Sequence, residues 1–267
     1  MPSRPGPSAR PKSYSTDAIV LRSVDEGEAD RRITLLTPGW GKAQAYVRGA
    51  RRITSRLGGH LDVLNHSRVS LAVGARWNVV TGAESIASFG RLKQDLDRIA
   101  AALYLAELTG AMLPEEAPHP AAYRLLLDAL RAIDGGAADD RLTARYLELR
   151  LLEDTGYMPE LSVCVVCGRA VEPDRHRFAP DMGGVTCDAC AVSQGRALPL
   201  SLSALKVLRH FARSGMAQGT AISASPALLT ELEMLLLSCI HAVLDRDTAS
   251  GVFIGHLRDM RRRPPRY

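Results

Sequence analysis

Four of the five cysteines form two matched pairs, and this pattern constrains the fold of its segment more than any other feature. The pairs are Cys164-x2-Cys167 and Cys187-x2-Cys190, separated by nineteen residues. Two residues between cysteines let both thiolates point from a tight turn into one tetrahedron, and Gly168 permits that turn after the first pair. Four thiolates complete the coordination of one Zn²⁺ ion and leave no position for water or substrate, which predicts a structural zinc site. Residues 161–197 have few long apolar side chains, so this segment needs a bound metal ion to stabilise its fold.

Two other interpretations of these cysteines stay open. They could be unrelated buried thiols, or one pair could be a redox site, although a redox pair usually begins a helix and a second pair would be surplus. Residues 1–14 lack the apolar segment of a secretory signal, so we expect a reducing compartment, where metal binding is favoured over disulfides. His176, between the pairs, could replace a ligand, but we expect a loop histidine. Cys239 lies on an apolar helical stripe and is expected in the core.

Strand patterns separated by turn residues fill the first eighty residues. Apolar runs or alternation predict strands over 17–24, 30–37, 42–50, 67–73 and 76–82. Proline and glycine mark the connection at residues 37–41, and Gly74 marks the last one. Five short strands predict a small barrel, and both an OB-fold and an SH3-like barrel fit the count.

After residue 90 the apolar period becomes helical. Helices are predicted over 92–113, 123–133, 142–152, 202–213 and 226–243. The third has apolar residues on more than one side and is expected to be buried. The predicted fold class is α+β, with an N-terminal small β-barrel followed by an all-helical domain that carries an inserted four-cysteine zinc finger. We divide the chain into a disordered basic tail (1–14), the barrel (15–85), the helical domain (86–160 and 198–250), the finger (161–197) and a basic C-terminal tail (251–267).

Positive charge is concentrated in the predicted barrel. Residues 1–80 hold thirteen Lys/Arg and six Asp/Glu, a net charge of +7, whereas residues 81–267 have a net charge of −2. A basic face suggests a polyanion as partner, either nucleic acid or anionic lipid. Basic residues interleaved with aromatic ones favour single-stranded nucleic acid, because phosphates pair with the former and bases stack on the latter. The candidate DNA-binding residues are Arg31, Arg32, Trp40, Lys42, Tyr46, Arg48, Arg51, Arg52 and Arg56.

These residues also have a purely structural interpretation. Trp40 could fill its turn, Tyr46 could pack on a barrel face, and the arginines could be solvated surface. We expect the side chains of Arg51, Arg52 and Arg56 to be free to follow phosphates, because they lie in a loop that ends in two glycines. The run RDMRRRPPR at 258–266 is either a phosphate-binding tail or a solvated end.

Motifs of catalysis are missing from the sequence. It contains no GxxxxGKS/T, HExxH, GxSxG or GxGxxG, and its seven histidines lack metal-ligand spacing. A nuclease would need metal-dependent cleavage, for which the sequence offers no support. No run of eighteen apolar residues is free of charge, so no transmembrane helix is predicted.

At three places the chain resembles the RecO family of bacterial recombination mediators. Residues 28–52, EADRRITLLTPGWGKAQAYVRGARR, resemble the family's barrel signature. Residues 147–167, LELRLLEDTGYMPELSVCVVC, resemble the helix that leads into its finger, and GGVTC at 183–187 resembles the approach to the second cysteine pair. The N-terminal tail and the RRRPPR end depart from the family pattern, and nothing is carried over to them.

The resemblance implies a DNA repair protein whose N-terminal OB-fold binds single- and double-stranded DNA. Such a protein anneals complementary strands and, with RecR, helps load RecA onto strands coated by single-strand-binding protein. It is not an enzyme, has no small-molecule substrate or membrane association, and is cytoplasmic and nucleoid-associated. A groove among the helices of residues 90–155 is expected to bind the acidic C-terminal tail of single-strand-binding protein. Candidate residues for its rim are Tyr123, Arg124, Arg131 and Arg150. The alternative is a zinc-ribbon DNA-binding regulator of transcription, which a strong duplex sequence preference would favour.

Overall fold

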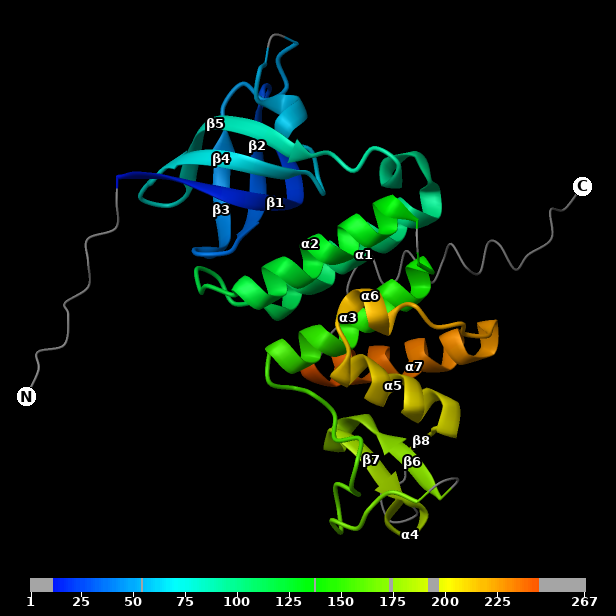
Figure 1. The fold of residues 1–267 in the computed structure, drawn as a ribbon. Coiled ribbons are helices and arrows are strands. Elements are labelled where there is room, and N and C mark those ends of the chain that lie inside the picture. The colour runs from blue at the N-terminus through cyan, green and yellow to red at the C-terminus, as the bar shows by residue number, and fades with distance from the viewer. Residues whose placement is uncertain (1–11, 54, 137, 173–174, 192–196, 245–267) are drawn as a thin grey trace, which may run out of the picture. The chain divides into compact units, whose positions relative to one another are not determined.

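The computed structural model describes residues 12–53, 55–136, 138–172, 175–191 and 197–244. The chain forms two compact units (Figure 1). One consists of Met1–Ser88 with Pro114–Pro120, and the other of Phe89–Leu113 with Ala121–Tyr267. Most of the predicted N-terminal tail and all of the C-terminal tail, with its arginine run, lie outside the described residues.

The first unit is a closed five-stranded barrel. Its strands are β1 (Ser13–Glu26), β2 (Asp30–Thr37), β3 (Gly41–Val47), β4 (His66–Ala72) and β5 (Asn78–Ala87). They pair in the order β1-β2-β3-β5-β4, and β4 returns to β1. The pair β3–β5 is parallel and the others are antiparallel. This closure is that of an OB-fold, so the OB-fold is confirmed among the two barrels that the strand count allowed.

Alternating side chains along the strands build the barrel core. In β3, Ala43, Ala45 and Val47 are buried, while Gln44 and Tyr46 between them are partly exposed. β1 pairs with β4 through its first half and with β2 through its second half, so one long strand closes the barrel. The inward side chains of the other strands complete an apolar core: Ala18, Val20, Ile33, Leu35, Val69, Leu71 and Val80.

The connection between β4 and β5 differs from the prediction. β5 begins at Asn78 instead of residue 76 and continues to Ala87. The turn before it is so tight that a Cβ on Gly74 would lie 2.1 Å from the carbonyl oxygen of Trp77. Arg76 and Trp77 therefore lie in this turn instead of in the strand.

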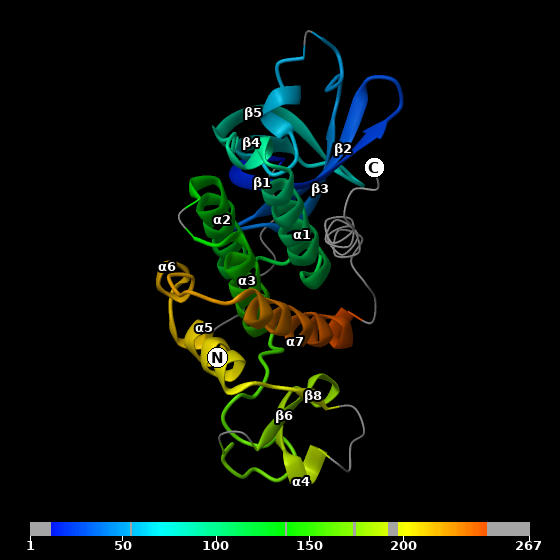
Figure 2. The same ribbon diagram turned by 90° about the vertical axis from the view of Figure 1, so that its right-hand side faces the viewer.

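The second unit is helical around one buried helix. Its helices are α1 (Leu96–Met112), α2 (Pro120–Gly135), α3 (Asp140–Asp154), α5 (Leu202–Arg213), the short α6 (Met216–Gly219) and α7 (Pro226–Leu244). α3 contacts α1, α5 and α7 (Figure 2), and its residues 142–149 are all buried, as predicted. The carboxylate of Asp95 accepts hydrogen bonds from the first backbone N–H groups of α1, so this helix begins at Leu96 instead of at residue 92.

One helix of the second unit is strongly apolar. In the part of the chain that the structure describes, α7 alone is long and apolar enough to cross a membrane by length and composition. However, it carries Glu231 and Glu233, contacts α3 and α5, and buries Leu232, Leu235 and Cys239. These features are typical of a core helix, and they confirm the expectation that Cys239 lies in the core.

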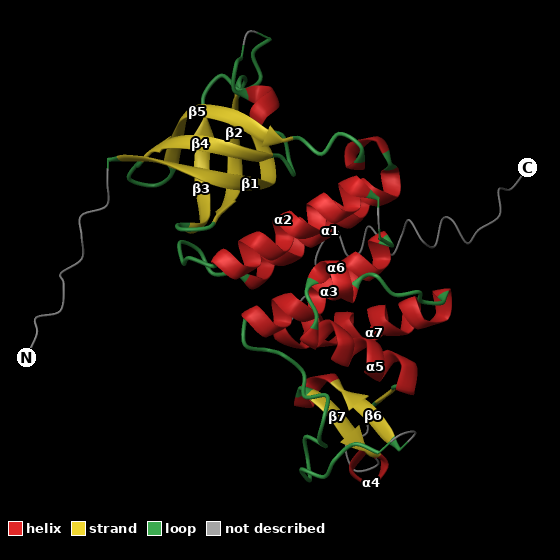
Figure 3. Cartoon of the chain, viewed as in Figure 1, coloured by secondary structure: helices red, strands yellow, loops and turns green. Residues whose placement is uncertain are grey.

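A small three-stranded sheet follows α3 in the chain (Figure 3). Its strands β6 (His176–Ala179), β7 (Gly184–Cys187) and β8 (Leu198–Pro199) pair in the order β7-β6-β8. The short 3₁₀ helix η3 (Pro180–Met182) precedes β7, and the short helix α4 (Asp188–Ala191) follows it. His176 and Phe178 share the buried side of β6, so the expectation of a loop histidine is wrong. With the barrel, the helices and this inserted four-cysteine segment in place, the predicted α+β fold class is confirmed.

Candidate metal centre and nucleic-acid interface

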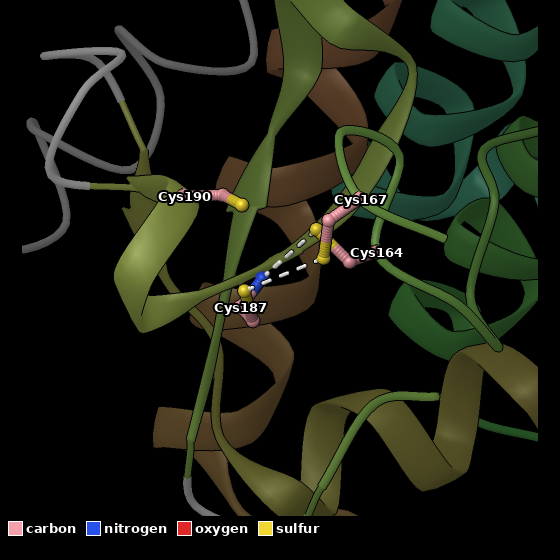
Figure 4. A group of neighbouring side chains, drawn as sticks. All are labelled: Cys164, Cys167, Cys187 and Cys190. Carbon is pink, nitrogen blue, oxygen red and sulfur yellow. Dashed lines mark hydrogen bonds between the residues drawn. The ribbon is translucent and has the colours of Figure 1, made fainter. Parts of the chain in front are cut away.

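The sulfur atoms of the two cysteine pairs converge in the finger (Figure 4). Cys164 and Cys167 come from the turn before β6, Cys187 ends β7 and Cys190 lies in α4. All four Sγ atoms lie within 4.8 Å of one another, and those of Cys167 and Cys187 are 3.9 Å apart. Gly168 has a φ of +70°, and its N–H donates to the carbonyl oxygen of Cys164 at 2.8 Å. The glycine therefore closes the first turn as its position predicts.

Hydrogen bonds favour ionisation of one thiol in this cluster. Burial opposes charge on Cys164, but backbone N–H groups, including those of Cys167 and Cys187, outweigh it and lower the pKa of this thiol to about 5. The pKa of Cys190 is raised to about 12, chiefly by its hydrogen bond with Cys187 and by burial. Full ionisation of the cluster near neutral pH thus requires a cation among the sulfurs. The cluster could therefore hold a metal ion.

His176 does not join this group of sulfurs. It pairs with Cys187 across β6 and β7, but its Nδ1 lies 2.9 Å from the carbonyl oxygen of Glu172. Within the described residues, the group of potential ligands consists of the four cysteines alone. Four cysteines form a closed donor set, which suits a structural metal instead of a catalytic one.

The second candidate site lies on β2, β3 and the β4–β5 turn of the barrel. Arg32 faces Tyr46 in the strand register, and the Tyr46 ring is within 2° of parallel to that of Trp77, with 6.4 Å between their centroids. The guanidinium carbons of Arg32 and Arg76 lie 5.1 Å and 4.4 Å from the Trp77 ring centroid, which are cation–π distances. We call Arg32, Tyr46, Arg76 and Trp77 the Trp77 cluster. It occupies the strands and the turn with which OB-folds bind oligonucleotides.

Trp77 and Arg76 are absent from the DNA-binding residues that the sequence predicts. An arginine and a tryptophan in the last turn of a five-stranded barrel are a signal that could have found them. The proximity of Trp77 to Tyr46, however, depends on the parallel pairing of β3 with β5, in which Ala45 faces Asn78. That pairing joins strands far apart in the sequence and has no local signature.

Trp40 is held in a different place on the barrel. Its ring is tilted by 33° against that of Tyr14, with 4.5 Å between centroids, and its backbone N–H donates to Thr37 Oγ1 at 3.1 Å. The ring thus packs on a residue of β1, and 36% of Trp40 stays exposed. The structure does not bring its ring into contact with the Trp77 cluster.

The predicted basic residues fall into two groups. Four form ion pairs: Arg31 with Asp25 and Asp62, Arg32 with Glu26, Lys42 with Glu115, and Arg51 with Asp25. Arg48, Arg52 and Arg56 are exposed and form no ion pair with any residue that the structure describes. The expectation of a free side chain is therefore wrong for Arg51, whereas Arg52 and Arg56 present unpaired guanidinium groups.

The residues predicted to bind a partner's tail are spread over α2 and α3. Tyr123 is only 5% exposed, whereas Arg124, on the same helix, is exposed. Arg131 and Arg150 each pair with an acidic residue of their own helix, and Arg150 also donates to the carbonyl oxygen of Ala212. Of the four, Arg124 and Arg131 share the exposed side of α2.

A cavity of about 690 Å³ lies between α2 and α6. Its lining is mostly apolar and includes Ala132, Met216 and Ala217, with Asp128 as its acidic member. Arg131 forms its ion pair with this Asp128 at 3.5 Å, so positive charge lies close to the cavity.

Two protein-family models together match nearly all of the residues that the structure describes. The family model described as "Recombination protein O N terminal" matches residues 12–89, and "Recombination protein O C terminal" matches residues 93–251. The chain belongs to the RecO family. The boundary between the two RecO models falls just after β5, so the first model covers the barrel strands and the second begins with the helices.

Several curated relatives are similar to the chain over most of its length. The DNA repair protein RecO of Roseiflexus sp. (strain RS-1) is 41% identical over 253 residues, which are 95% of this chain and 89% of the relative. The protein of the same name from Dehalococcoides mccartyi (strain BAV1) is 35% identical, over 93% of this chain and 98% of the relative. That of Anaeromyxobacter sp. (strain K) is 34% identical, over 90% and 94%. The RecO resemblance seen in the sequence is thus confirmed.

Proposed function

We propose that this RecO-family chain is a recombination mediator in DNA repair. It binds single- and double-stranded DNA, anneals complementary strands and, with RecR, helps load RecA onto strands coated by single-strand-binding protein. The observation that carries the proposal is the Trp77 cluster on the face where OB-folds bind strands. In this proposal the barrel (15–85) contacts DNA, the helical parts (86–160 and 198–250) contact a protein partner, and the finger (161–197) is a structural insert.

The surface of the barrel suits annealing for a physical reason. Two complementary strands repel each other through their phosphates, and exposed arginines such as Arg48, Arg52 and Arg56 reduce that repulsion. Aromatic rings stack on every base, so binding through Tyr46 and Trp77 tolerates any sequence. An annealing factor needs both properties, because it must bring together strands of arbitrary sequence. Neither property requires an enzyme or a small-molecule substrate.

We infer that the metal of the finger is zinc and that it is structural. Four sulfurs placed 2.3 Å from a zinc ion lie about 3.8 Å from one another in a tetrahedron. The distance of 3.9 Å between the sulfurs of Cys167 and Cys187 is close to that value. Because all four donors are cysteines, zinc would hold the fold of the finger and would have no position for water or substrate.

The helical unit is the proposed binding region for the acidic tail of single-strand-binding protein. The apolar cavity between α2 and α6 can take an apolar end of a peptide, and Arg124 and Arg131 supply positive charge nearby for its carboxylates. Titration with a labelled acidic peptide ending in Phe tests this assignment. Arg124→Ala with Arg131→Ala should weaken binding, while Lys206→Ala on α5 serves as control. Absence of binding at low salt would reject it.

Strand annealing is the experiment that tests the proposed function. Two complementary labelled oligonucleotides are mixed with the protein, with and without single-strand-binding protein, and duplex formation is followed by energy transfer. We expect the wild-type chain to accelerate annealing and Trp77→Ala to lose much of the acceleration. Strong preference for one duplex sequence without annealing would favour the alternative, a zinc-ribbon regulator of transcription. Recovery of the protein with the cytoplasmic nucleoid fraction would support the proposed location.

A further inference from the structure

Asp25 holds two arginines of the barrel face at once. It lies near the end of β1, opposite Arg31 of β2 in the strand register. One of its carboxylate oxygens is 3.3 Å from Nε of Arg31, and the other is 3.4 Å from Nε of Arg51. Two guanidinium groups thus converge on one anion. Arginines bind phosphate oxygens through the same N–H groups, so the position of this carboxylate is one that a phosphate could take.

These ion pairs are open to exchange with a ligand. The side chain of Asp25 is 56% exposed, that of Arg31 is 28% exposed and that of Arg51 is 40% exposed. Exposed ion pairs contribute little free energy, so an incoming anion can replace the carboxylate at small cost. Arg51 is also held by its backbone N–H, which donates to the carbonyl oxygen of Ala29 at 2.9 Å. This bond keeps the base of the arginine in place when the carboxylate is displaced.

We propose that Asp25 is a built-in competitor for DNA phosphate on the barrel. When a strand binds, its phosphates replace the carboxylate as the partners of Arg31 and Arg51. When the strand dissociates, the ion pairs with the carboxylate form again. The inference rests on the proposed DNA binding and adds a determinant of affinity and release. An arginine already neutralised by a carboxylate adds less to counterion release when DNA arrives, so affinity and its salt dependence are lower than the number of arginines predicts.

Two further acidic side chains, Glu26 and Asp62, also pair with arginines of this face and influence how much Asp25 weakens DNA binding. Glu26 repeats the arrangement at the Trp77 cluster, because its Oε2 lies 3.0 Å from Nε of Arg32. Asp62 forms a second ion pair with Arg31, at 3.4 Å. Removal of the charge on Asp25 therefore leaves Arg31 paired with Asp62, whereas Arg51 keeps a hydrogen bond to the uncharged carbonyl oxygen of Gly27, at 3.4 Å. Most of the gain in DNA binding is expected from Arg51. A protein that anneals strands must release the product, and such a competitor favours release.

Asp25→Asn tests the inference, with Asp17→Asn as its matched control. Asp17 lies on the same strand and pairs with Arg68 at 2.9 Å, so each substitution removes one negative charge and one partner of an arginine. Binding of a labelled oligothymidine is measured by fluorescence anisotropy over a series of salt concentrations. We expect Asp25→Asn to bind roughly two- to fivefold tighter and to dissociate more slowly. Its salt slope should be steeper by about 0.7, whereas Asp17→Asn should keep the wild-type slope.

A double variant assigns the gain to the released arginine. Asp25→Asn with Arg51→Ala should lose the additional slope, and thermal melting should show that neither variant has lost its fold. Equal affinities and slopes in Asp25→Asn and Asp17→Asn would overturn the inference while leaving DNA binding intact. A gain that persists in the double variant would also overturn it. If the wild-type chain does not bind the oligonucleotide at all, the proposed function fails and this inference fails with it.

Discussion

The two units of the chain use their charged and polar side chains differently. The barrel encloses an apolar core and keeps its ion pairs at the surface, as Asp25 and Arg31 do. The helical unit buries Arg145 and Glu148 together, 4% and 0% exposed, and its finger gathers four cysteine sulfurs. Exposed pairs are easily exchanged, whereas breaking a buried pair leaves an uncompensated charge. The surface charges of the barrel are therefore available to a ligand, because its fold depends on the buried apolar core.

Substitutions of polar groups should therefore have different effects in the two units. Changes to the polar groups of the second unit should lower stability and leave DNA binding by the barrel unchanged. Changes to the polar groups of the barrel should alter DNA binding and leave stability nearly unchanged.

Loss of the metal should have the largest effect of all. Among its described residues the finger buries few long apolar side chains, namely Leu161, Phe178 and Val185. The metal site must therefore contribute the stability that this small core cannot. Cys187→Ser should reduce the zinc content from one ion per chain and unfold the finger, measured by elemental analysis and thermal melting. Cys239→Ala is the control, because it removes a cysteine from the core of α7 and not from the cluster. Unchanged melting of metal-free protein would contradict the prediction.

Acid should also destabilise the finger, and the pKa of Cys164 gives the direction. In the folded protein this pKa is about 5, below the value of about 8.5 for an ordinary cysteine. A lowered pKa stabilises the folded state fully above the unfolded value, and the contribution shrinks as the pH falls and is lost below about 5. Protons also compete with the metal for the sulfurs. Zinc release followed with a chelating dye should therefore increase as the pH is lowered from 8 to 5, whereas the barrel should keep binding DNA.

Breaking the buried ion pair of the helical unit should give the next largest loss of stability. Glu148 accepts a hydrogen bond from the Tyr104 hydroxyl at 2.7 Å and pairs with Arg145 at 2.6 Å. Glu148→Gln removes the closer carboxylate from the buried guanidinium, and Glu233, at 3.7 Å, is then its acidic partner among the described residues. We expect a loss of roughly 3–5 kcal/mol in the free energy of unfolding, measured by chemical denaturation.

An exposed pair on the same helix provides the control for this measurement. Glu153 pairs with Arg150 at the same sequence spacing, but its side chain is 43% exposed. Glu153→Gln should cost less than about 1 kcal/mol. If both substitutions cost the same, burial does not separate the two kinds of ion pair and the comparison between the units fails. DNA affinity should be unchanged in both variants.

In the barrel, Trp77→Ala should give the largest change in DNA binding. Stacking of one base on an aromatic side chain is worth roughly 1–3 kcal/mol, which corresponds to a loss of about 5- to 150-fold in affinity for single strands. The salt slope should change little, because no phosphate contact is lost. Trp40→Ala is the matched control, since Trp40 packs on Tyr14 and does not touch the Trp77 cluster. An equal loss of affinity in both variants would mean that the cluster is not a base-binding platform.

The parts predicted well from the sequence are those with local signatures. The strand over Asp30–Thr37 has the predicted bounds, because a polar loop and a Pro-Gly turn delimit its apolar run. The cysteine spacing predicted the sulfur cluster, because two knuckles with CxxC spacing have few other ways to fold. The burial of α3 followed from apolar residues on several of its sides.

The parts that were missed depend on contacts between distant segments. Trp77 joins Tyr46 only through a parallel strand pair, and Arg51 meets Asp25 only after the loop folds back on the first hairpin. A count of charges cannot show that an arginine is already neutralised. Arg145 and Glu148 are three residues apart, a spacing that is also common for ion pairs on the surface of a helix. This pair is buried because other elements pack around α3, which the spacing does not show.

The smallest effect is expected for the unpaired arginines of the barrel, and it distinguishes them from the paired ones. Arg52 and Arg56 are exposed and form no ion pair among the described residues, so each is ready to contact a phosphate. Arg52→Ala and Arg56→Ala should each lower the salt slope for single strands by roughly 0.7, with a change in stability within about 0.5 kcal/mol. Arg68→Ala serves as control, because Arg68 is equally a surface arginine of the barrel but pairs with Asp17. If all three variants lower the slope equally, DNA responds only to the total charge of the barrel. If only Arg52→Ala and Arg56→Ala lower it, the strand follows a defined path over the loop after β3, and the ion pairs of the barrel decide which arginines it meets.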